Sequence, residues 1–575
     1  MKSSSQHTFA RVPRVDIPRS SFKRNMTYKT TFDAGNLIPI YIDEVLPGDT
    51  FNLNLTSFVR MLSPLKYPIL DNLYVDYQFF FCPIRLVWDK YEEFFGSSKG
   101  QSGNWEYDDS NLVPAMELND FDLETLGNDG GLLGDYFGLP TNVISLKVNA
   151  LPFRVYNRVI ADWYRPSSYE LSSPALNTDD GPDSWEDYPI QKRLKRCDYF
   201  TSALISPQRG PGVDLPIAGM VPVTSWNPMT EVFEPLSLGT SRFTGSQTPS
   251  EVKSQTNYLY HNGGTDKLAN VTQITDELPA AGSTVTNTTY PSGSNPHIDA
   301  NKILGVNEGL YADLSNISAV SINSLRQAFQ LQRALERDMR GGVRYVEQLL
   351  SHFGVRSPDA RLQRTEYLGG GTMPIQIHTV ANTNGASGST QAQLAAFAVG
   401  ANTSVGFVKS FVEHGYIICL ASARADLTYQ QGVPKMFDRW QRFDFYYPVF
   451  AHLGEQIIKN KEIMAQGEDV TDFSGRVIDE LPFGYQERYG EYRYGVNKIT
   501  NRLRSDYGNS LDVWHLAQYF DNLPTLNATF LAENPPMDRV EAVTSEPDFI
   551  LDALITLNCV RPMPLYGVPG LVDHF

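Results

Sequence analysis

The stretch from Asp71 to Asp89, DNLYVDYQFFFCPIRLVWD, constrains the fold of this 575-residue chain more than any other. Alternate positions are apolar, whereas the positions between them are polar early and apolar late. That period of two predicts a β-strand, and Pro83 ends it because proline has no backbone N–H to donate. We expect Phe80 and Cys82 to be covered by an inserted loop or a neighbouring copy, and one face to point into a sandwich: Leu73, Val75, Tyr77, Phe79 and Phe81.

Other segments with strand or helix periodicity lie along the whole chain. Strands are predicted at Leu37–Val45, Phe51–Val59, Met373–Val380, Thr403–Val412, Tyr416–Arg424, Arg442–Phe450 and Phe549–Cys559. Helices are predicted at Arg85–Phe95, Leu151–Tyr164, Ser324–Arg340, Leu453–Met464 and Ser510–Phe520. Because β segments frame helices and loops, the sequence favours a mainly β protein, one sandwich over residues 31–575 with large helical and loop insertions.

Charge is distributed unevenly. The net charge of −17 argues against a generic nucleic-acid coat. Residues 1–30 nevertheless carry seven Lys or Arg and one acid, and Pro13 and Pro18 forbid a long helix there, which predicts a basic extended arm. Residues 89–140 carry twelve acids and two lysines. Solvated surface explains both patterns about equally well.

Two further stretches combine cations with a regular spacing. In the predicted helix Ser324–Arg340, four arginines share one face, which could meet phosphate, an acidic loop or solvent: Arg326, Arg333, Arg337 and Arg340. The stretch Gly484–Arg504 interleaves tyrosines with cations, among them Tyr489, Tyr492 and Arg493. Such a pattern suits single-stranded nucleic acid or a protein interface, and we favour the interface.

Residues Ser237–Ala300 differ in composition from the rest of the chain. Of these 64 residues, 30 are Ser, Thr, Asn or Gly, and few apolar residues recur with any period. We expect a polar surface insertion with short β-hairpins that adds little core.

Motifs for catalysis, metals and membranes are weak or absent. The only G-x-S-x-G match, residues 96–100, follows a helix-like segment rather than the strand that a nucleophile elbow requires. Acids at Asp120, Asp122, Glu124 and Asp129 resemble a calcium loop, but Thr125 occupies the required glycine position, so calcium binding stays open. We expect no enzyme activity, no cofactor, no disulfide framework among the four cysteines, no secretory signal and no membrane span.

Longer motifs carry a resemblance. They include FARVPRVDIPRSSF near the start, RLQRTEYLGGG in the middle, and HGYIICLASARADLTYQQG, FGYQERYGEYRY, SLDVWHLAQYF, ENPPMDRV and RPMPLYGVPGLVDHF later. In these the chain resembles the major capsid proteins of gokushoviruses, small single-stranded DNA phages of the Microviridae. The resemblance covers most of the chain except Ser237–Ala300, where only the position of a variable loop matches.

The resemblance implies an eight-stranded antiparallel jelly-roll subunit with a structural role. It implies a virion protein, assembled in the bacterial cytoplasm into a T=1 icosahedral shell with fivefold, threefold and twofold contacts around circular single-stranded DNA. Implied partners are a small basic DNA-binding protein, a pilot protein, an internal scaffolding protein and a host receptor. A threefold protrusion for host contact would correspond to residues 237–300.

The resemblance assigns an expected role to two sets of candidate residues. The basic arm is expected on the inner surface or on DNA, through Arg11, Arg14, Arg19, Lys23 and Arg24. The host-contact candidates are Thr240, Asn257, Tyr258, Tyr260, Asn287 and Tyr290. The alternative class is a carbohydrate-active jelly-roll enzyme or lectin, which would need carboxylates that converge in a cleft.

Overall fold

The computed structural model describes residues 17–95, 112–118, 133–141, 143, 146–165, 174–213, 223–227, 232–235, 255–260, 267–273, 310–312, 322–341, 349–354, 363–383 and 393–566. The chain divides into two compact units. The larger comprises Met1–Gly210 with Leu335–Phe575, and the smaller comprises Pro211–Ala334.

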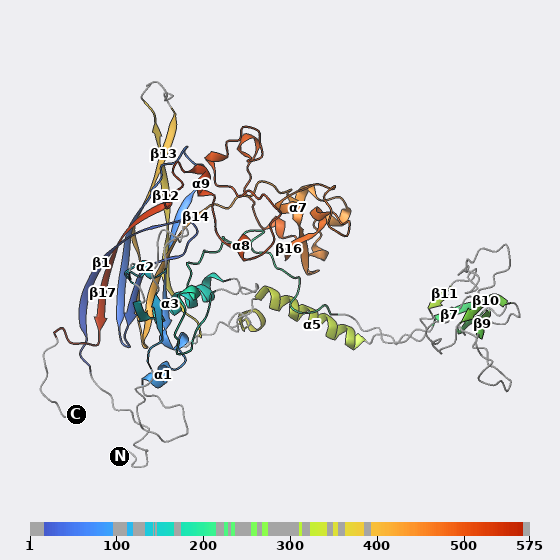
Figure 1. Cartoon of the computed structure of the whole chain (residues 1–575), viewed down its shortest axis with the longest axis horizontal. Coiled ribbons are helices and arrows are strands. Elements are labelled where there is room, and N and C mark those ends of the chain that lie inside the picture. Colours follow the sequence, from blue (N-terminus) through green and yellow to red (C-terminus); the bar gives the residue numbers. More distant parts are fainter. Residues whose placement is uncertain are drawn as a thin grey trace, which may run out of the picture. The chain divides into compact units, whose positions relative to one another are not determined.

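An eight-stranded antiparallel sheet forms the centre of the larger unit (Figure 1). Its strands are β1 (Ser20–Phe32), β2 (Ile38–Val45), β3 (Thr50–Met61), β4 (Leu73–Pro83), β12 (Glu366–Ala381), β13 (Leu394–Ser410), β14 (Gly415–Ala425) and β17 (Phe549–Arg561). Their order is β1-β17-β3-β13-β12-β4-β14-β2. The first of these strands therefore pairs with the last, the second with the seventh, the third with the sixth and the fourth with the fifth. This nested pairing is that of a jelly roll and confirms the predicted fold.

The two end strands of this order approach each other. Arg24 on β1 forms an ion pair with Asp43 on β2, with 2.6 Å between nitrogen and oxygen. The hydroxyl of Tyr28 on β1 also donates to the carbonyl of Pro39, at 3.4 Å. The sheet thus curls into a barrel-like sandwich around one apolar interior.

Strand β4 lies in this interior as predicted. The face that carries Leu73, Val75, Tyr77, Phe79 and Phe81 belongs to the central core. Its other face, at Phe80 and Cys82, belongs to a second apolar cluster and is also buried. Rings of Trp163, Tyr164 and Tyr367 lie 5.6–6.0 Å from the Phe80 ring. Phe80 is therefore covered by residues of the same chain.

The second cluster is built by the insertion after β4. Its elements are η2 (Ile84–Leu86), α1 (Tyr91–Phe94), β5 (Ala115–Leu118), α2 (Leu133–Tyr136), β6 (Leu146–Asn149), α3 (Leu151–Val159), η3 (Ile160–Tyr164) and η4 (Trp185–Asp187). The predicted helix over Leu151–Tyr164 is confirmed as α3 followed by a π-helical turn. Because this layer covers β14 from outside, all eleven residues of β14 are buried.

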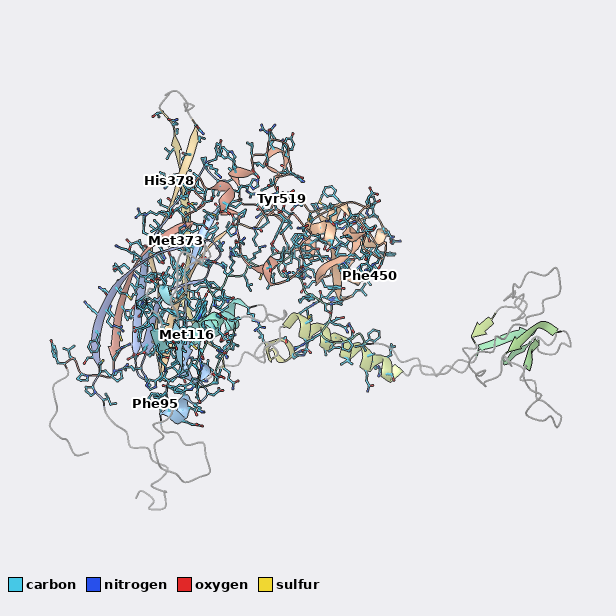
Figure 2. The ribbon with its side chains drawn as sticks, viewed as in Figure 1. Phe95, Met116, Met373, His378, Phe450 and Tyr519 are labelled. Carbon is cyan, nitrogen blue, oxygen red and sulfur yellow. The ribbon has the colours of Figure 1, made fainter. Side chains whose placement is uncertain are left out.

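A second insertion, between β14 and β17, shares a small core with Tyr199, Phe200 and Ala203. Its elements are η7 (Lys435–Phe437), η8 (Arg442–Asp444), η9 (Pro448–Phe450), β15 (Glu455–Lys459), α7 (Asn460–Ile463), η10 (Ile478–Glu480), β16 (Pro482–Glu487), η11 (Gly490–Tyr492), η12 (Asn501–Leu503), η13 (Asp512–Trp514), α8 (Ala528–Leu531) and α9 (Met537–Val540). Figure 2 labels Phe450 and Tyr519 within it.

Several predictions for this part of the chain are wrong. Arg442–Phe450 forms two 3₁₀ turns rather than a strand, because Asp444 caps the first and Pro448 starts the second. Leu453–Met464 is split into strand β15 and the single turn α7. Of Ser510–Phe520, only Asp512–Trp514 is helical. Local packing of Ile458, Ile463 and Leu516 overrides the periodicity in the last two segments, whereas large apolar side chains of the first remain exposed.

The predicted arm, residues 1–30, also needs correction at its boundary. Residues 20–30 belong to β1, which pairs along its whole length with β17, from Ser20 opposite Arg561 to Phe32 opposite Phe549. The segment is extended, as predicted, but its partner is a strand of the same chain. Residues 1–16, with Arg11 and Arg14, lie outside the described residues.

Among the residues that the structure describes, two separate β elements belong to the smaller unit. Strands β7 (Val223–Asn227), β8 (Val232–Pro235) and β11 (Leu310–Ala312) form one sheet, and β9 (Gln255–Tyr260) pairs with β10 (Lys267–Gln273). The predicted helix Ser324–Arg340 is confirmed as α5 (Ile322–Gly341) and ends at the predicted glycine. A short π-helix, η6 (Leu349–Phe353), follows it.

Candidate functional site

Residues 436–453 in the second insertion expose an unusual concentration of large apolar side chains, which we call the aromatic surface. Trp440 is 83% exposed and Val449 is 82% exposed. The other members are Met436, Phe437, Phe443, Phe445, Tyr446 and Leu453. Exposed large apolar side chains gathered in one segment are typical of a surface that contacts another macromolecule.

Hydrogen bonds hold the turns that present this surface. The carboxylate of Asp444 accepts hydrogen bonds from the backbone nitrogens of Trp440 and Gln441, at 2.8 and 2.7 Å. The Arg439 guanidinium lies 5.9 Å from the centre of the Phe445 ring. The aromatic side chains are therefore displayed by a fixed backbone.

A network of ion pairs lies beside the aromatic surface. The buried carboxylate of Asp438 pairs with Lys459 at 2.9 Å and with Lys461 at 2.6 Å, and both lysines also pair with Glu480. Burial alone would raise the pKa of Asp438, but the hydrogen bonds from Lys461 and Lys459 outweigh burial and hold that pKa below its ordinary value. The network ties the aromatic segment to β15 and α7.

Beside this surface lies a cavity of about 500 Å³, the tyrosine pocket. Tyr199, Phe200 and Tyr429 are buried at its floor, and Tyr492 and Tyr494 line it nearer the surface. These residues come from three segments far apart in the sequence, so only the folded chain brings them together.

Of the three basic contact candidates of the predicted arm that the structure describes, the two arginines have partners within the chain. The side chain of Arg19 donates to the backbone oxygen of Gly48 and, at 3.2 Å, to Thr50, and Arg24 is paired with Asp43. Both thus contribute to contacts inside the jelly roll. Lys23 is exposed on β1.

The arginines of α5 divide in the same way. Arg340 pairs with Glu455 and, at 3.8 Å, with Glu487. Within the described ranges, Arg326, Arg333 and Arg337 are exposed and form no ion pair. These three remain available to an anionic partner.

The predicted tyrosine–arginine stretch is only partly accessible. Tyr489 is buried, and its hydroxyl donates to the carbonyl of Phe445 at 3.2 Å, so it packs inside the insertion rather than acting as a contact residue. Arg493 pairs with Glu487. Tyr492 is 56% exposed and lines the tyrosine pocket.

The host-contact candidates are described only in part. Asn257, Tyr258 and Tyr260 lie on β9, opposite Val271, Asn270 and Lys267 of β10. Thr240, Asn287 and Tyr290 lie outside the described residues, as do the G-x-S-x-G match and the acidic cluster around Asp120.

Within the part of the chain that the structure describes, no group of three or more His, Cys, Asp or Glu side chains is arranged to hold a metal ion. No helix among the described residues is long and apolar enough to cross a membrane. All four cysteines are free, with Cys82, Cys419 and Cys559 buried and Cys197 exposed.

The aromatic surface is not predicted from the sequence. The prediction of a strand over Arg442–Phe450 conceals it, although WQRFDFYYPVF has no clean alternation and contains a proline. The density of aromatics without a period was the available signal, because such residues find no single core face to occupy.

A jelly roll that carries helical and loop insertions and exposes large apolar side chains is an architecture found among viral coat proteins. The family model described as "Capsid protein (F protein)" matches residues 10–571, and the chain belongs to this phage capsid family. The gokushovirus resemblance is thereby confirmed, and the role is structural rather than enzymatic.

Individual relatives match over almost their whole length. The chain is 42% identical over 580 residues to capsid protein VP1 of Bdellovibrio phage phiMH2K, covering 99% of both chains. It is 41% identical over 601 residues to capsid protein VP1 of Chlamydia phage 1, covering 99% of this chain and 98% of the other. It is 35% identical over 587 residues to capsid protein VP1 of Spiroplasma virus 4, covering 98% and 97%.

Proposed function

We propose that copies of this capsid protein self-assemble into a T=1 icosahedral shell around a circular single-stranded DNA genome. The observation that carries the proposal is the aromatic surface, where Trp440 and Val449 are more than four-fifths exposed in the single chain. Obligate interfaces are large and hydrophobic, and burial of these side chains against a neighbouring copy supplies such a contact. The relatives' shared name, capsid protein VP1, agrees with this role.

The finer features of the proposal follow the family resemblance. Residues 1–16 lie on the inner surface, where Arg11 and Arg14 meet DNA. Residues 237–300 form a threefold protrusion that contacts a host receptor. A small basic DNA-binding protein offsets the repulsion between DNA and a chain of net charge −17, and a pilot and an internal scaffolding protein take part in assembly in the bacterial cytoplasm.

Assembly is tested by substitution within the aromatic surface. Trp440→Glu places a charge where an apolar contact is proposed, so we expect folded subunits that do not form particles by electron microscopy and sedimentation. The matched control is Phe473→Glu, because Phe473 is fully exposed and lies outside the aromatic surface. Normal particles from Trp440→Glu would contradict the proposed interface. If the far-ultraviolet circular dichroism spectrum shows that Trp440→Glu is unfolded, the same test is made with Val449→Asp.

A further inference from the structure

The tyrosine pocket has the size of a small-ligand site. It encloses about 500 Å³ between residues 429–439 and 491–504, with Tyr199, Phe200 and Glu462 at its floor. Ligand sites in proteins commonly occupy roughly 300–1,000 Å³ and combine apolar walls with a few polar groups. The shell-forming role uses the aromatic surface and leaves this cavity unexplained.

The walls of the pocket are flat and aromatic. Phe200 packs edge-on against Tyr429, with 5.2 Å between ring centres, and Tyr199 packs edge-on against Phe200 at the same distance. Nearer the surface, Tyr492 is 56% and Tyr494 is 37% exposed. The Arg439 guanidinium lies 4.6 Å from the centre of the Tyr492 ring and fixes that ring in place. Any planar base can stack on such rings, because every base has a π-face.

The charges in the pocket favour an anion. Two of its cations are already neutralised, since Lys435 pairs with Glu462 and Arg439 pairs with Glu491, both at 2.7 Å. Lys498 and Arg504 also line the pocket, are exposed, and form no ion pair within the ranges that the structure describes. The pocket thus holds two cations in excess of its carboxylates, in a chain whose net charge is −17.

We propose that the tyrosine pocket binds one nucleotide of single-stranded DNA, with its base against Tyr492 and Tyr494 and its phosphate beside Lys498 and Arg504. The inference deepens the proposed function and rests on it, because the ligand is a segment of the enclosed genome. Single-stranded DNA repeats one base and one phosphate in every nucleotide, and a stretch in which tyrosines recur beside cations matches that repeat. This match favours DNA over an acidic peptide as the ligand. From residue 488 to 504 the chain has five basic residues and one acid.

The test uses the purified full-length chain and an oligodeoxythymidylate 12-mer carrying a photoreactive base. Mass spectrometry should locate crosslinks at Tyr492 or Tyr494. Tyr492→Ala should weaken binding roughly tenfold, whereas Tyr492→Phe, which keeps the ring, should bind as the parent does. The matched control is Tyr507→Ala, since Tyr507 is similarly exposed but lies outside the pocket.

The phosphate contacts have a separate readout. Replacing both Lys498 and Arg504 by alanine should make the plot of log affinity against log salt shallower by roughly 1.4, which is the value for two phosphates of a single strand. An unchanged slope, or equal affinities for Tyr492→Ala and Tyr507→Ala, would overturn the proposal. So would a peptide of residues 117–135 that binds in the pocket while the oligonucleotide does not.

Shell formation and nucleotide binding can be tested separately. If the parent chain forms no particles under the electron microscope, the shell-forming proposal fails. If DNA-filled particles form but their DNA crosslinks elsewhere than the pocket, only the nucleotide site is overturned.

Discussion

At the residue scale, one buried ion pair fastens the layer that covers β4 and β14. Arg154 on α3 donates two hydrogen bonds to Asp183, at 2.8 and 2.6 Å, and both side chains are 1% exposed. The guanidinium also donates to the backbone oxygens of Val87 and Asp179. One side chain therefore joins helix α3 to two other segments of the outer layer, one at Val87 and one at residues 179–183.

Removing this side chain should be costly. Arg154→Ala leaves the Asp183 carboxylate buried and unpaired, so we expect a loss of about 3–5 kcal/mol in the free energy of unfolding. Denaturant unfolding of the subunit measures it. The comparison variant is Arg85→Ala, which breaks the partly exposed pair with Glu413 and should cost about 1 kcal/mol or less. Equal losses in the two variants would contradict the importance of burial here.

A second buried residue makes stability depend on pH. Burial, together with the charges of Asp548, Asp538 and Asp33, raises the pKa of Glu541 to about 8, against an ordinary value of 4.5. The folded chain therefore keeps a proton that the unfolded chain releases. The contribution of this proton to the stability of the folded chain is complete below pH 4.5 and is lost as the pH rises through 8. The pKa of Asp548, raised by burial to about 6, acts in the same direction.

The neutral amide should reduce this dependence. For Glu541→Gln we expect a melting temperature that falls less between pH 5 and pH 9 than that of the parent chain. Glu546→Gln provides the control, because Glu546 is exposed. If the melting temperatures of Glu541→Gln and the parent chain fall equally between pH 5 and pH 9, Glu541 is not the protonated group.

At the scale of elements, strand β1 separates two roles that the sequence joins in one arm. Residues 20–24 pair with Leu557–Arg561 of β17, and Arg24 pairs with Asp43 of β2. Deleting residues 1–16 leaves these contacts intact, whereas deleting residues 1–24 removes them. A truncation that ends at residue 16 therefore keeps the β1–β17 pairing and the Arg24–Asp43 ion pair, and one that ends at residue 24 does not.

We expect the two truncations to behave differently. Deletion of residues 1–16 should leave the melting temperature within about a degree of that of the parent chain. It should also lower the DNA content of particles, because Arg11 and Arg14 are lost. Deletion of residues 1–24 should lower the melting temperature by several degrees as well. Calorimetry and the ratio of absorbance at 260 to 280 nm measure the two effects. Full, stable particles after the longer deletion would refute both assignments.

The elements also show what the sequence can and cannot predict. Strand β4 was predictable because its alternation and Pro83 both reflect backbone geometry. Helix α5 was predictable from its apolar spacing and its terminal glycines. Turns η8 and η9 were not, because Asp444 and Pro448 fix them locally while their aromatic rings remain exposed. The tyrosine pocket was out of reach because Tyr199, Tyr429 and Tyr492 meet only after folding.

At the scale of the whole molecule, the composition of residues 237–300 suits a surface rather than a core, because 30 of these 64 residues are Ser, Thr, Asn or Gly. Among the residues that the structure describes, the three buried clusters contain none between 204 and 372. Replacing residues 237–300 with a short Gly-Ser linker should therefore leave subunit stability and particle formation unchanged while reducing adsorption to host cells. Thermal unfolding, electron microscopy and an adsorption assay provide the readouts. Soluble aggregates in place of particles would mean that the insertion is structural.

The central claim is that the aromatic surface joins copies of this chain in a shell. Cryo-electron microscopy of particles assembled from the parent chain tests it most directly. The account predicts a closed T=1 shell in which Trp440 and Val449, exposed in the single chain, are buried against a neighbouring copy. Dispersed monomers, or a shell in which both side chains still face solvent, would contradict it.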